Sequence, residues 1–140
     1  MKKKNILFLC TGNSCRSQMA EGWGKKIWGE KYQFFSAGIK KHGINTRAVE
    51  VMKGYDVDIS FHESNVVEEL GDISFDIVFT VCSDAHETCP FLSGAKIIHV
   101  GFDDPPLLTK NLTDESEILK VYDRVCLEIK EFVENLEDYI

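Results

Sequence analysis

Short apolar runs alternate with helical patterns along this chain, and that alternation restricts the fold more than any other feature of the sequence. The apolar runs predict strands at residues 5–9, 32–36, 76–82 and 96–100. The helical patterns predict helices at residues 18–28, 46–54, 63–70 and 114–136. Strands that alternate with helices form a parallel sheet with helices on both of its faces. The predicted fold is therefore α/β, with three layers and a four-stranded parallel sheet flanked by helices.

The length and composition of the chain favour one domain over residues 1–140. Of these 140 residues, 44% are hydrophobic, which is enough to form a core without disulfides or metal. No internal repeat and no linker rich in Gly, Ser or Pro divides the sequence. We therefore expect all predicted strands to belong to one sheet.

The charge and the apolar content of the sequence exclude several classes of partner. A net charge of -7, from 23 acidic and 16 basic residues, repels nucleic acid and anionic membranes. No apolar run approaches the roughly 20 residues that cross a bilayer, and the run after Lys4 is too short for a signal peptide. Five cysteines without a secretory signal indicate a reducing compartment, so we expect a cytoplasmic protein whose cysteines are catalytic or redox-active.

A cysteine and an arginine lie near opposite ends of the loop between the first predicted strand and the first predicted helix. The loop reads Cys10-Thr11-Gly12-Asn13-Ser14-Cys15-Arg16-Ser17. Its backbone N–H groups and the helix N-terminus can converge on one anion, and the planar guanidinium of Arg16 can bind two oxyanion oxygens. This positive field should lower the pKa of Cys10 below the free value of about 8.5. The loop predicts a thiolate facing a tetrahedral oxyanion, with Ser17 donating a hydrogen bond to the sulfur.

Two further groups follow predicted strands and therefore belong to the same edge of the sheet, where parallel sheets bind ligands. Cys82 ends the third predicted strand, and Asp103-Asp104 follows the fourth. A carboxylic acid at this edge can protonate a departing oxygen. If residues 83–88 were helical, the Cα atoms of Cys82 and Cys89 would lie about 10 Å apart, beyond the roughly 7 Å that a disulfide allows. A Cys82–Cys89 disulfide would require this segment to unwind.

The loop from Cys10 to Ser17 resembles the signature loop of the low-molecular-weight protein tyrosine phosphatases and of the thioredoxin-coupled arsenate reductases, which share one fold. The phosphatases usually have proline at the position of Gln18, so the continuation resembles the reductases; it reads Gln18-Met19-Ala20-Glu21-Gly22-Trp23. A segment similar in both groups is Ser36-Ala37-Gly38. The resemblance covers nearly the whole chain and implies the low-molecular-weight tyrosine phosphatase fold.

The resemblance implies that the chain reduces arsenate to arsenite. Cys10 attacks arsenate, and Asp104, which directly precedes Pro105, protonates the leaving oxygen. Cys82 then attacks the Cys10 sulfur and arsenite departs. Cys89 attacks Cys82 in turn, and the resulting Cys82–Cys89 disulfide is reduced by thioredoxin. These steps need three thiols and no tightly bound cofactor.

Some reductases of this family bind a monovalent cation, such as potassium, near the loop. The matching positions in this sequence are Asn13, Glu21, Ser36 and Asn65. Asn65 stands where the family often has aspartate, so the site has a neutral oxygen donor in place of a charged one. A different metal site, zinc bound by Cys82, His86 and Cys89, fits no common ligand spacing.

Two other functions stay open at this point. A protein tyrosine phosphatase could use the same loop, but phosphatases often grip the tyrosine ring with aromatic residues after the acid, where this chain has Pro106, Leu107 and Leu108. A redox-sensing binding module would use a Cys82–Cys89 switch to change a partner surface. The remaining candidates are interpreted as structural; they are Cys126, His42, His62 and His99.

Overall fold

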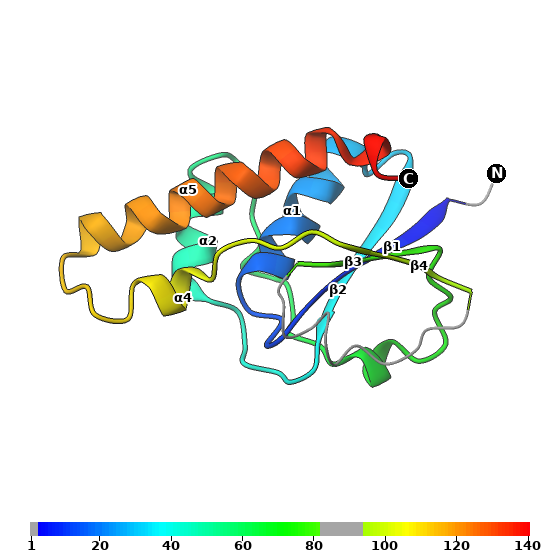
Figure 1. Ribbon diagram of the computed structural model, residues 1–140, viewed down its shortest axis with the longest axis horizontal. Coiled ribbons are helices and arrows are strands. Elements are labelled where there is room, and N and C mark those ends of the chain that lie inside the picture. Colours follow the sequence, from blue (N-terminus) through cyan, green and yellow to red (C-terminus); the bar gives the residue numbers. More distant parts are fainter. Residues whose placement is uncertain (1–2, 82–93) are drawn as a thin grey trace.

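Strands and helices alternate over the first half of the chain, as the sequence predicts, and the last helices follow the fourth strand. The computed structural model describes residues 3–81 and 94–140. In chain order the elements are β1 (Lys4–Cys10), α1 (Arg16–Trp28), β2 (Tyr32–Gly38), α2 (Thr46–Lys53), the 3₁₀ helix η1 (Val67–Leu70), β3 (Ile77–Thr80), β4 (Lys96–His99), α4 (Pro105–Leu108), α5 (Glu115–Glu134) and the 3₁₀ helix η2 (Leu136–Asp138). The four strands are all parallel, in the order β2-β1-β3-β4, which confirms the predicted sheet. Figure 1 shows α1 and α5 together on one face of this sheet.

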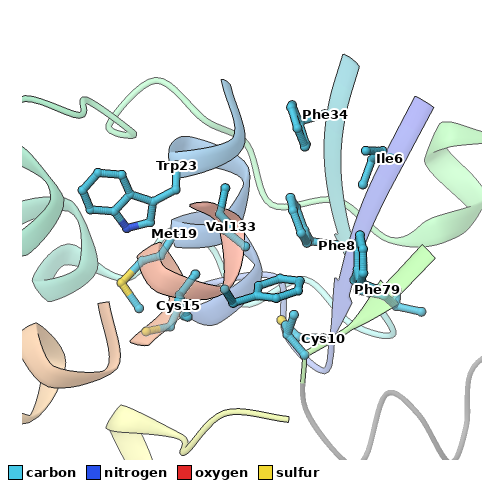
Figure 2. Close-up of a cluster of buried hydrophobic side chains, with 14 of the residues drawn as sticks. Ile6, Phe8, Cys10, Cys15, Met19, Trp23, Phe34, Phe79 and Val133 are labelled. Atoms are coloured by element: carbon cyan, nitrogen blue, oxygen red, sulfur yellow. The ribbon is translucent and has the colours of Figure 1, made fainter. Parts of the chain in front are cut away.

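The strand β1 lies inside the sheet because its side chains are apolar on both faces. Residues 6–9 are all fully buried, although alternate side chains point to opposite faces. On one face Phe8 stacks on Phe34 of β2 and Phe79 of β3, and it meets Phe132 of α5 edge to face. Figure 2 shows the Phe8 ring between the side chains of Phe34 and Phe79, with Cys10 beyond it along β1. This packing fixes the position of the residue that ends the strand.

The long helix α5 covers the sheet with the apolar stripe that the sequence predicts. Its N-terminus is capped by Asp114, whose carboxylate accepts a hydrogen bond from the Ser116 backbone. The buried positions recur every three or four residues; they include Ile118, Tyr122, Val125, Ile129 and Phe132. The helix α1 packs beside α5, and Trp28 donates a hydrogen bond to the Val133 carbonyl at 2.7 Å. No helix in the described parts of the chain is long and apolar enough to cross a membrane.

The predicted helix at residues 63–70 is wrong for the first half of its length, because only Val67–Leu70 forms a helical turn. The residues directly before this turn form hydrogen bonds to other segments of the chain. The Gly38 N–H donates to the Asn65 carbonyl at 2.8 Å, and Gly38 and Val66 form an isolated parallel bridge. The Asn65 N–H donates to the Asn13 side chain at 2.6 Å. Backbone groups with these partners cannot also bond within a helix.

Other boundaries differ from the predictions by smaller amounts. The strand β1 extends through Cys10, and α1 begins at Arg16 rather than at residue 18. The third strand is shorter than expected and ends at Thr80. Pro105–Leu108 forms the helix α4, which the sequence analysis did not predict. A proline at the first helical position is favourable, since its fixed φ suits the helix and the missing N–H would have no helical partner there.

The strand order changes direction at β1, which has β2 on one side and β3 on the other. In open parallel sheets, ligands bind beyond the carboxyl ends of the strands at such a point. Cys10 is the last residue of β1, and Asp104 follows β4. The topology therefore brings the predicted nucleophile and the predicted acid to one edge of the sheet.

Candidate active site

A cavity of about 350 Å³ opens at the carboxyl end of β1, where the sequence predicts an oxyanion site. Its walls are formed by Cys10, Thr11, Gly12, Ser14, Cys15, Arg16, His42, Asn45, Asp104 and Pro106. Two other predicted residues, Asn13 and Ser17, are fully buried. The fold therefore joins the loop after β1 to Asp104, which lies far away in the sequence.

The four carbonyl oxygens in the middle of the loop accept hydrogen bonds from outside it. The carbonyls of residues 11–14 have as donors the backbone N–H groups of Ile39, Lys40, His42 and Asn45 and the side chain of Gln18. In a planar trans peptide the C=O and the following N–H point in opposite directions. The N–H groups of residues 12–15 thus point away from these donors, as a backbone cradle for an anion requires.

Arg16 is held in place by the segment that follows β4. Its Nη1 donates to the Phe102 carbonyl at 3.0 Å, and its Nη2 lies 3.7 Å from Oδ1 of Asp104. Only 12% of the Arg16 side chain is exposed, so solvent screens its charge less than that of a surface arginine. The neighbouring Asp103 instead pairs with Arg124 on α5 at 3.2 Å. Of the two adjacent carboxylates, Asp104 is the one that lines the cavity.

The Cys10 sulfur is the end of a hydrogen-bonded chain of three side chains. Cys10 Sγ lies 2.8 Å from Ser17 Oγ, and Ser17 Oγ accepts a hydrogen bond from Asn13 Nδ2 at 2.9 Å. Because the Ser17 oxygen accepts from Asn13, its hydroxyl hydrogen is available to Cys10. A hydrogen bond donated to sulfur favours the thiolate over the thiol. The arrangement agrees with the predicted role of Ser17.

Removing the Ser17 hydroxyl is expected to make Cys10 a weaker nucleophile near neutral pH. In a Ser17→Ala variant, the loss of one hydrogen bond to the thiolate should move the pH midpoint of Cys10 alkylation upward by about one unit. The alkylation rate at about pH 7 should fall up to about 10-fold. Iodoacetamide labelling followed by peptide mass spectrometry measures both effects. Ser60→Ala, which removes a surface hydroxyl bonded to Asp58, is the control, and an unchanged midpoint in Ser17→Ala contradicts the assignment.

The second cysteine of the loop, Cys15, is a protonated thiol, whereas the proposed nucleophile Cys10 is expected to be a thiolate. Cys15 is 4% exposed, and burial raises its pKa to about 12. Cys126 on α5 is fully buried with its sulfur 3.4 Å from Met52 Sδ, and burial raises its pKa to about 11. Both thiols are therefore protonated at neutral pH. The interpretation of Cys126 as a core residue is confirmed.

The raised pKa of Cys15 predicts a loss of stability at alkaline pH. Its folded pKa lies above the ordinary value of 9.0, so the thiol contributes stability below about pH 9 that is lost as the pH rises toward about 12. Between about pH 9 and about pH 11, the free energy of unfolding of the unmodified protein should fall more steeply than that of Cys15→Ala. The difference in slope should be about 1 kcal/mol per pH unit. Urea unfolding at several pH values measures it, and parallel curves would contradict the prediction.

Two glycines allow the loop to approach its neighbours closely. A Cβ on Gly38 would lie 2.7 Å from the Thr11 carbonyl oxygen and 2.8 Å from the Asn13 nitrogen. Gly38 is also the register partner of Cys10 in the sheet. A Cβ on Gly12 would lie 2.3 Å from Nδ1 of His42, so the imidazole ring rests directly on the loop backbone. The loop therefore packs against the end of β2 and against His42 without intervening side chains.

Gln18 connects the loop to the segment before η1. Its side-chain amide donates to the carbonyls of Asn13 and Glu63, both at 3.1 Å, and its oxygen lies 2.9 Å from His62 Nδ1. Because the amide oxygen of Gln18 can only accept, His62 Nδ1 is the donor in the last contact. Gln18 is fully buried, and burial lowers the pKa of His62. This network explains how a residue outside the loop can hold the loop carbonyl of Asn13.

The chain is similar in sequence to known proteins over nearly its whole length. Residues 5–139 match the family described as low molecular weight phosphotyrosine protein phosphatase. The chain belongs to this family. Arsenate reductase 2 of Staphylococcus saprophyticus is 48% identical to it over 136 residues, which cover 96% of this chain and 100% of that protein. An arsenate reductase of Staphylococcus aureus is 49% identical over 133 residues, which cover 94% and 98% of the two chains.

Solved structures of family members agree with the fold. An arsenate reductase in the phosphate binding state aligns with a TM-score of 0.81 and 29% identity, over 98% of both chains. The low molecular weight protein tyrosine phosphatase from T. tengcongensis aligns with a TM-score of 0.77 and 26% identity, over 99% of this chain and 100% of that one. The predicted resemblance to both branches of the family is confirmed.

The four positions that match the family's cation site lie in two contacting pairs. Ser36 Oγ donates to the Glu21 carboxylate, which also pairs with the Lys25 ammonium, and Asn13 Oδ1 accepts from the Asn65 N–H. The Lys25 ammonium already supplies positive charge beside Glu21, so a bound cation would have to share that carboxylate with it. Within residues 3–81 and 94–140, no cluster of three His, Cys, Asp or Glu side chains could hold a metal ion. A potassium ion stays a prediction, and no step of the mechanism depends on it.

Two predicted site residues, Cys82 and Cys89, lie outside the described residues, as does His86. The neighbouring residue Val81 is described and fully buried. Its N–H donates to the carbonyl of Leu9, the residue before Cys10, at 2.9 Å. The chain therefore passes beside the end of β1 directly before Cys82.

The sequence analysis missed two residues of the cavity wall. Asn45 caps the N-terminus of α2, where its Oδ1 accepts from two backbone N–H groups, and its own N–H binds the loop. An asparagine directly before a predicted helix is a recognisable N-cap signal. His42 carries no such local signal, because its contact with Gly12 exists only in the folded chain.

Proposed function

We propose that this chain reduces arsenate to arsenite, with Cys10 as the nucleophile. The observation that carries the proposal is the Cys10 sulfur beside the Ser17 hydroxyl, in a cavity that Arg16 and the loop backbone make suitable for a tetrahedral oxyanion. Relatives named arsenate reductases, 48% and 49% identical over nearly the full chain, support arsenate as the oxyanion. The chemistry needs thiols and a proton donor, and the described cavity contains both kinds of group.

In the proposed first step, the Cys10 thiolate attacks arsenic and an S–As bond forms. One arsenate oxygen departs as water with a proton from Asp104, so arsenic stays in the +5 state. Arg16 and the N–H groups of residues 12–15 stabilise the negative charge on the remaining oxygens, the kind of preorganised electrostatic stabilisation that lowers reaction barriers most. The position of Asp104 next to Arg16, within the cavity wall, supports its role as the acid.

In the proposed second step, the Cys82 thiolate attacks Cys10 Sγ. A Cys10–Cys82 disulfide forms, the S–As bond breaks, and its electron pair reduces arsenic to the +3 state of arsenite. The Cys89 thiolate then attacks Cys82, which releases Cys10 and leaves a Cys82–Cys89 disulfide. A dithiol reductant of the thioredoxin type restores both thiols. The hydrogen bond between Val81 and Leu9 supports this order, because those residues directly precede Cys82 and Cys10.

A coupled assay with thioredoxin, thioredoxin reductase and NADPH tests the proposal. Arsenate should drive continuous NADPH oxidation and arsenite release in the unmodified protein, and none in Cys10→Ser. Cys89→Ser should release at most about one arsenite per chain, since its Cys10–Cys82 disulfide cannot be passed on. Cys126→Ser, which changes a thiol buried against Met52, is the control and should turn over continuously. Continuous turnover in Cys89→Ser would contradict the proposed transfer of the disulfide from Cys10–Cys82 to Cys82–Cys89.

A phosphatase is the second candidate, because the family match and the T. tengcongensis structure carry that activity in their names. One observation disfavours it. Among the described residues that line the cavity there is no Phe, Tyr or Trp to hold a tyrosine ring. Catalytic efficiencies on arsenate and on a phosphotyrosine peptide distinguish the two candidates. The thiols of Cys82 and Cys89 are dispensable for ester hydrolysis, so a phosphatase would keep its activity in Cys82→Ser.

A further inference from the structure

The cavity contains one imidazole to which neither the sequence analysis nor the proposed mechanism assigns a role. His42 lies in its wall, on the segment between β2 and α2. Its backbone N–H donates to the Gly12 carbonyl at 3.1 Å, and its ring lies against Gly12. The Nδ1 edge is nearest to the loop, so Nε2 lies on the far side of the ring. His42 is therefore tied to the oxyanion loop through both its backbone and its side chain.

The charges that line the cavity do not by themselves favour a doubly charged anion. Arg16 supplies one positive charge, and the Cys10 thiolate that the proposed function requires supplies one negative charge. The helix N-terminus and the loop N–H groups add only partial positive charge. Among the described side chains of the wall, His42 is the remaining one that can become a cation. An imidazolium there would add a second full positive charge to the cavity wall.

Several charged or titratable groups lie around His42 and would interact with an imidazolium there. They are Cys10, Cys15 and Arg16 on the loop, Asp104 before α4, and Lys40 and Lys41 on its own segment. Lys41 is paired with Glu69 at 2.9 Å, and Cys15 stays protonated because burial raises its pKa to about 12. A bound oxyanion would add negative charge to the cavity whose wall His42 shares with Arg16.

We propose that His42 in its imidazolium form is a second cationic contact for the bound oxyanion. The proposal rests on the proposed function only in taking this cavity as the oxyanion site. Oxyanion affinity should then fall as the pH rises through the range in which histidine loses its proton. The contact acts on binding, so removing it should raise KM for arsenate with little change in kcat.

Protection of Cys10 from iodoacetamide by inorganic sulfate tests this without any turnover. Sulfate keeps the same double negative charge throughout the range in which histidine titrates. At about pH 6, His42→Gln should need roughly 5- to 10-fold more sulfate for half-protection than the unmodified protein, and at about pH 8 less than about 2-fold more. His42→Lys carries its charge at both pH values, so it should bind sulfate tightly at both. His99→Gln, on the exposed edge strand β4, is the matched control and should behave like the unmodified protein.

Two results would overturn the proposal. Equal protection of His42→Gln and the unmodified protein at about pH 6 would show that the charge of His42 does not contribute to binding the anion. Equally weak binding by His42→Gln and His42→Lys would show that the ring acts only by packing on Gly12. Either result leaves the proposed reductase activity intact, because that activity is measured separately by arsenite release.

Discussion

Replacing Arg16 by lysine is expected to lower kcat/KM for arsenate by about 100- to 1000-fold. The guanidinium makes one contact with the Phe102 carbonyl at 3.0 Å and another with Asp104 at 3.7 Å, both from the segment after β4. It can keep these contacts and still present N–H groups to two oxyanion oxygens, because its donors form a planar fork. A lysine has one nitrogen and cannot do both. Steady-state arsenite release at varied arsenate concentration measures the loss.

Two controls separate this effect from unfolding. Arg47→Lys changes a surface arginine that pairs with Glu115 at 2.9 Å, and it should keep the activity of the unmodified protein. Thermal unfolding should show Arg16→Lys folded at the assay temperature. An Arg16→Lys variant within about 5-fold of normal efficiency would mean that the fork geometry of Arg16 does not contribute to the transition state.

Replacing Gly38 by alanine is expected to remove most of the activity although residue 38 has no chemical role. The added Cβ would meet three backbone atoms; these are the Thr11 oxygen at 2.7 Å, the Asn13 nitrogen at 2.8 Å and the Lys40 oxygen at 2.9 Å. Backbone atoms cannot rotate away as a flexible side chain can, so the loop itself must move. We expect a loss of about 100-fold in kcat/KM and a loss of about 1–3 kcal/mol in the free energy of unfolding.

Gly54→Ala is the matched control for Gly38→Ala. Gly54 follows α2 with a helical φ of -61°, and the nearest atom to a Cβ there is the Val51 oxygen at 3.3 Å. Its free energy of unfolding should change by less than about 1 kcal/mol, and its activity should be normal. Urea unfolding and arsenite release measure both variants. Normal activity in Gly38→Ala would show that the loop tolerates displacement from the end of β2.

The loop after β1 could be predicted from the sequence because its functional groups are close together along the chain. The Cys10–Ser17 contact joins residues in the same strand-to-helix connection, so the spacing alone brings them into reach. Asp104 could be placed only at the correct edge of the sheet. The family resemblance selects Asp104 over Asp103, and the fold supplies the physical reason, because Asp103 pairs with Arg124 on α5 while Asp104 lies in the cavity wall.

The parts that could not be predicted depend on contacts between distant segments. Residues 63–70 have a helical pattern, yet Asn65 and Val66 bind Gly38 and the loop, so tertiary hydrogen bonds replace the local helix. His42 has no neighbour in sequence that marks it as part of an oxyanion site. Only the missing side chain at Gly12 allows its ring to reach the cavity.

We propose that Cys10, Cys82 and Cys89 act one after another as nucleophiles in the reduction of arsenate. The most direct test is peptide mass spectrometry of the fully reduced protein after treatment with arsenate in the absence of any reductant. The account predicts one arsenite released per chain, a Cys82–Cys89 disulfide and a free Cys10. Arsenite release with all three thiols still reduced, or no arsenite and no disulfide, would contradict it.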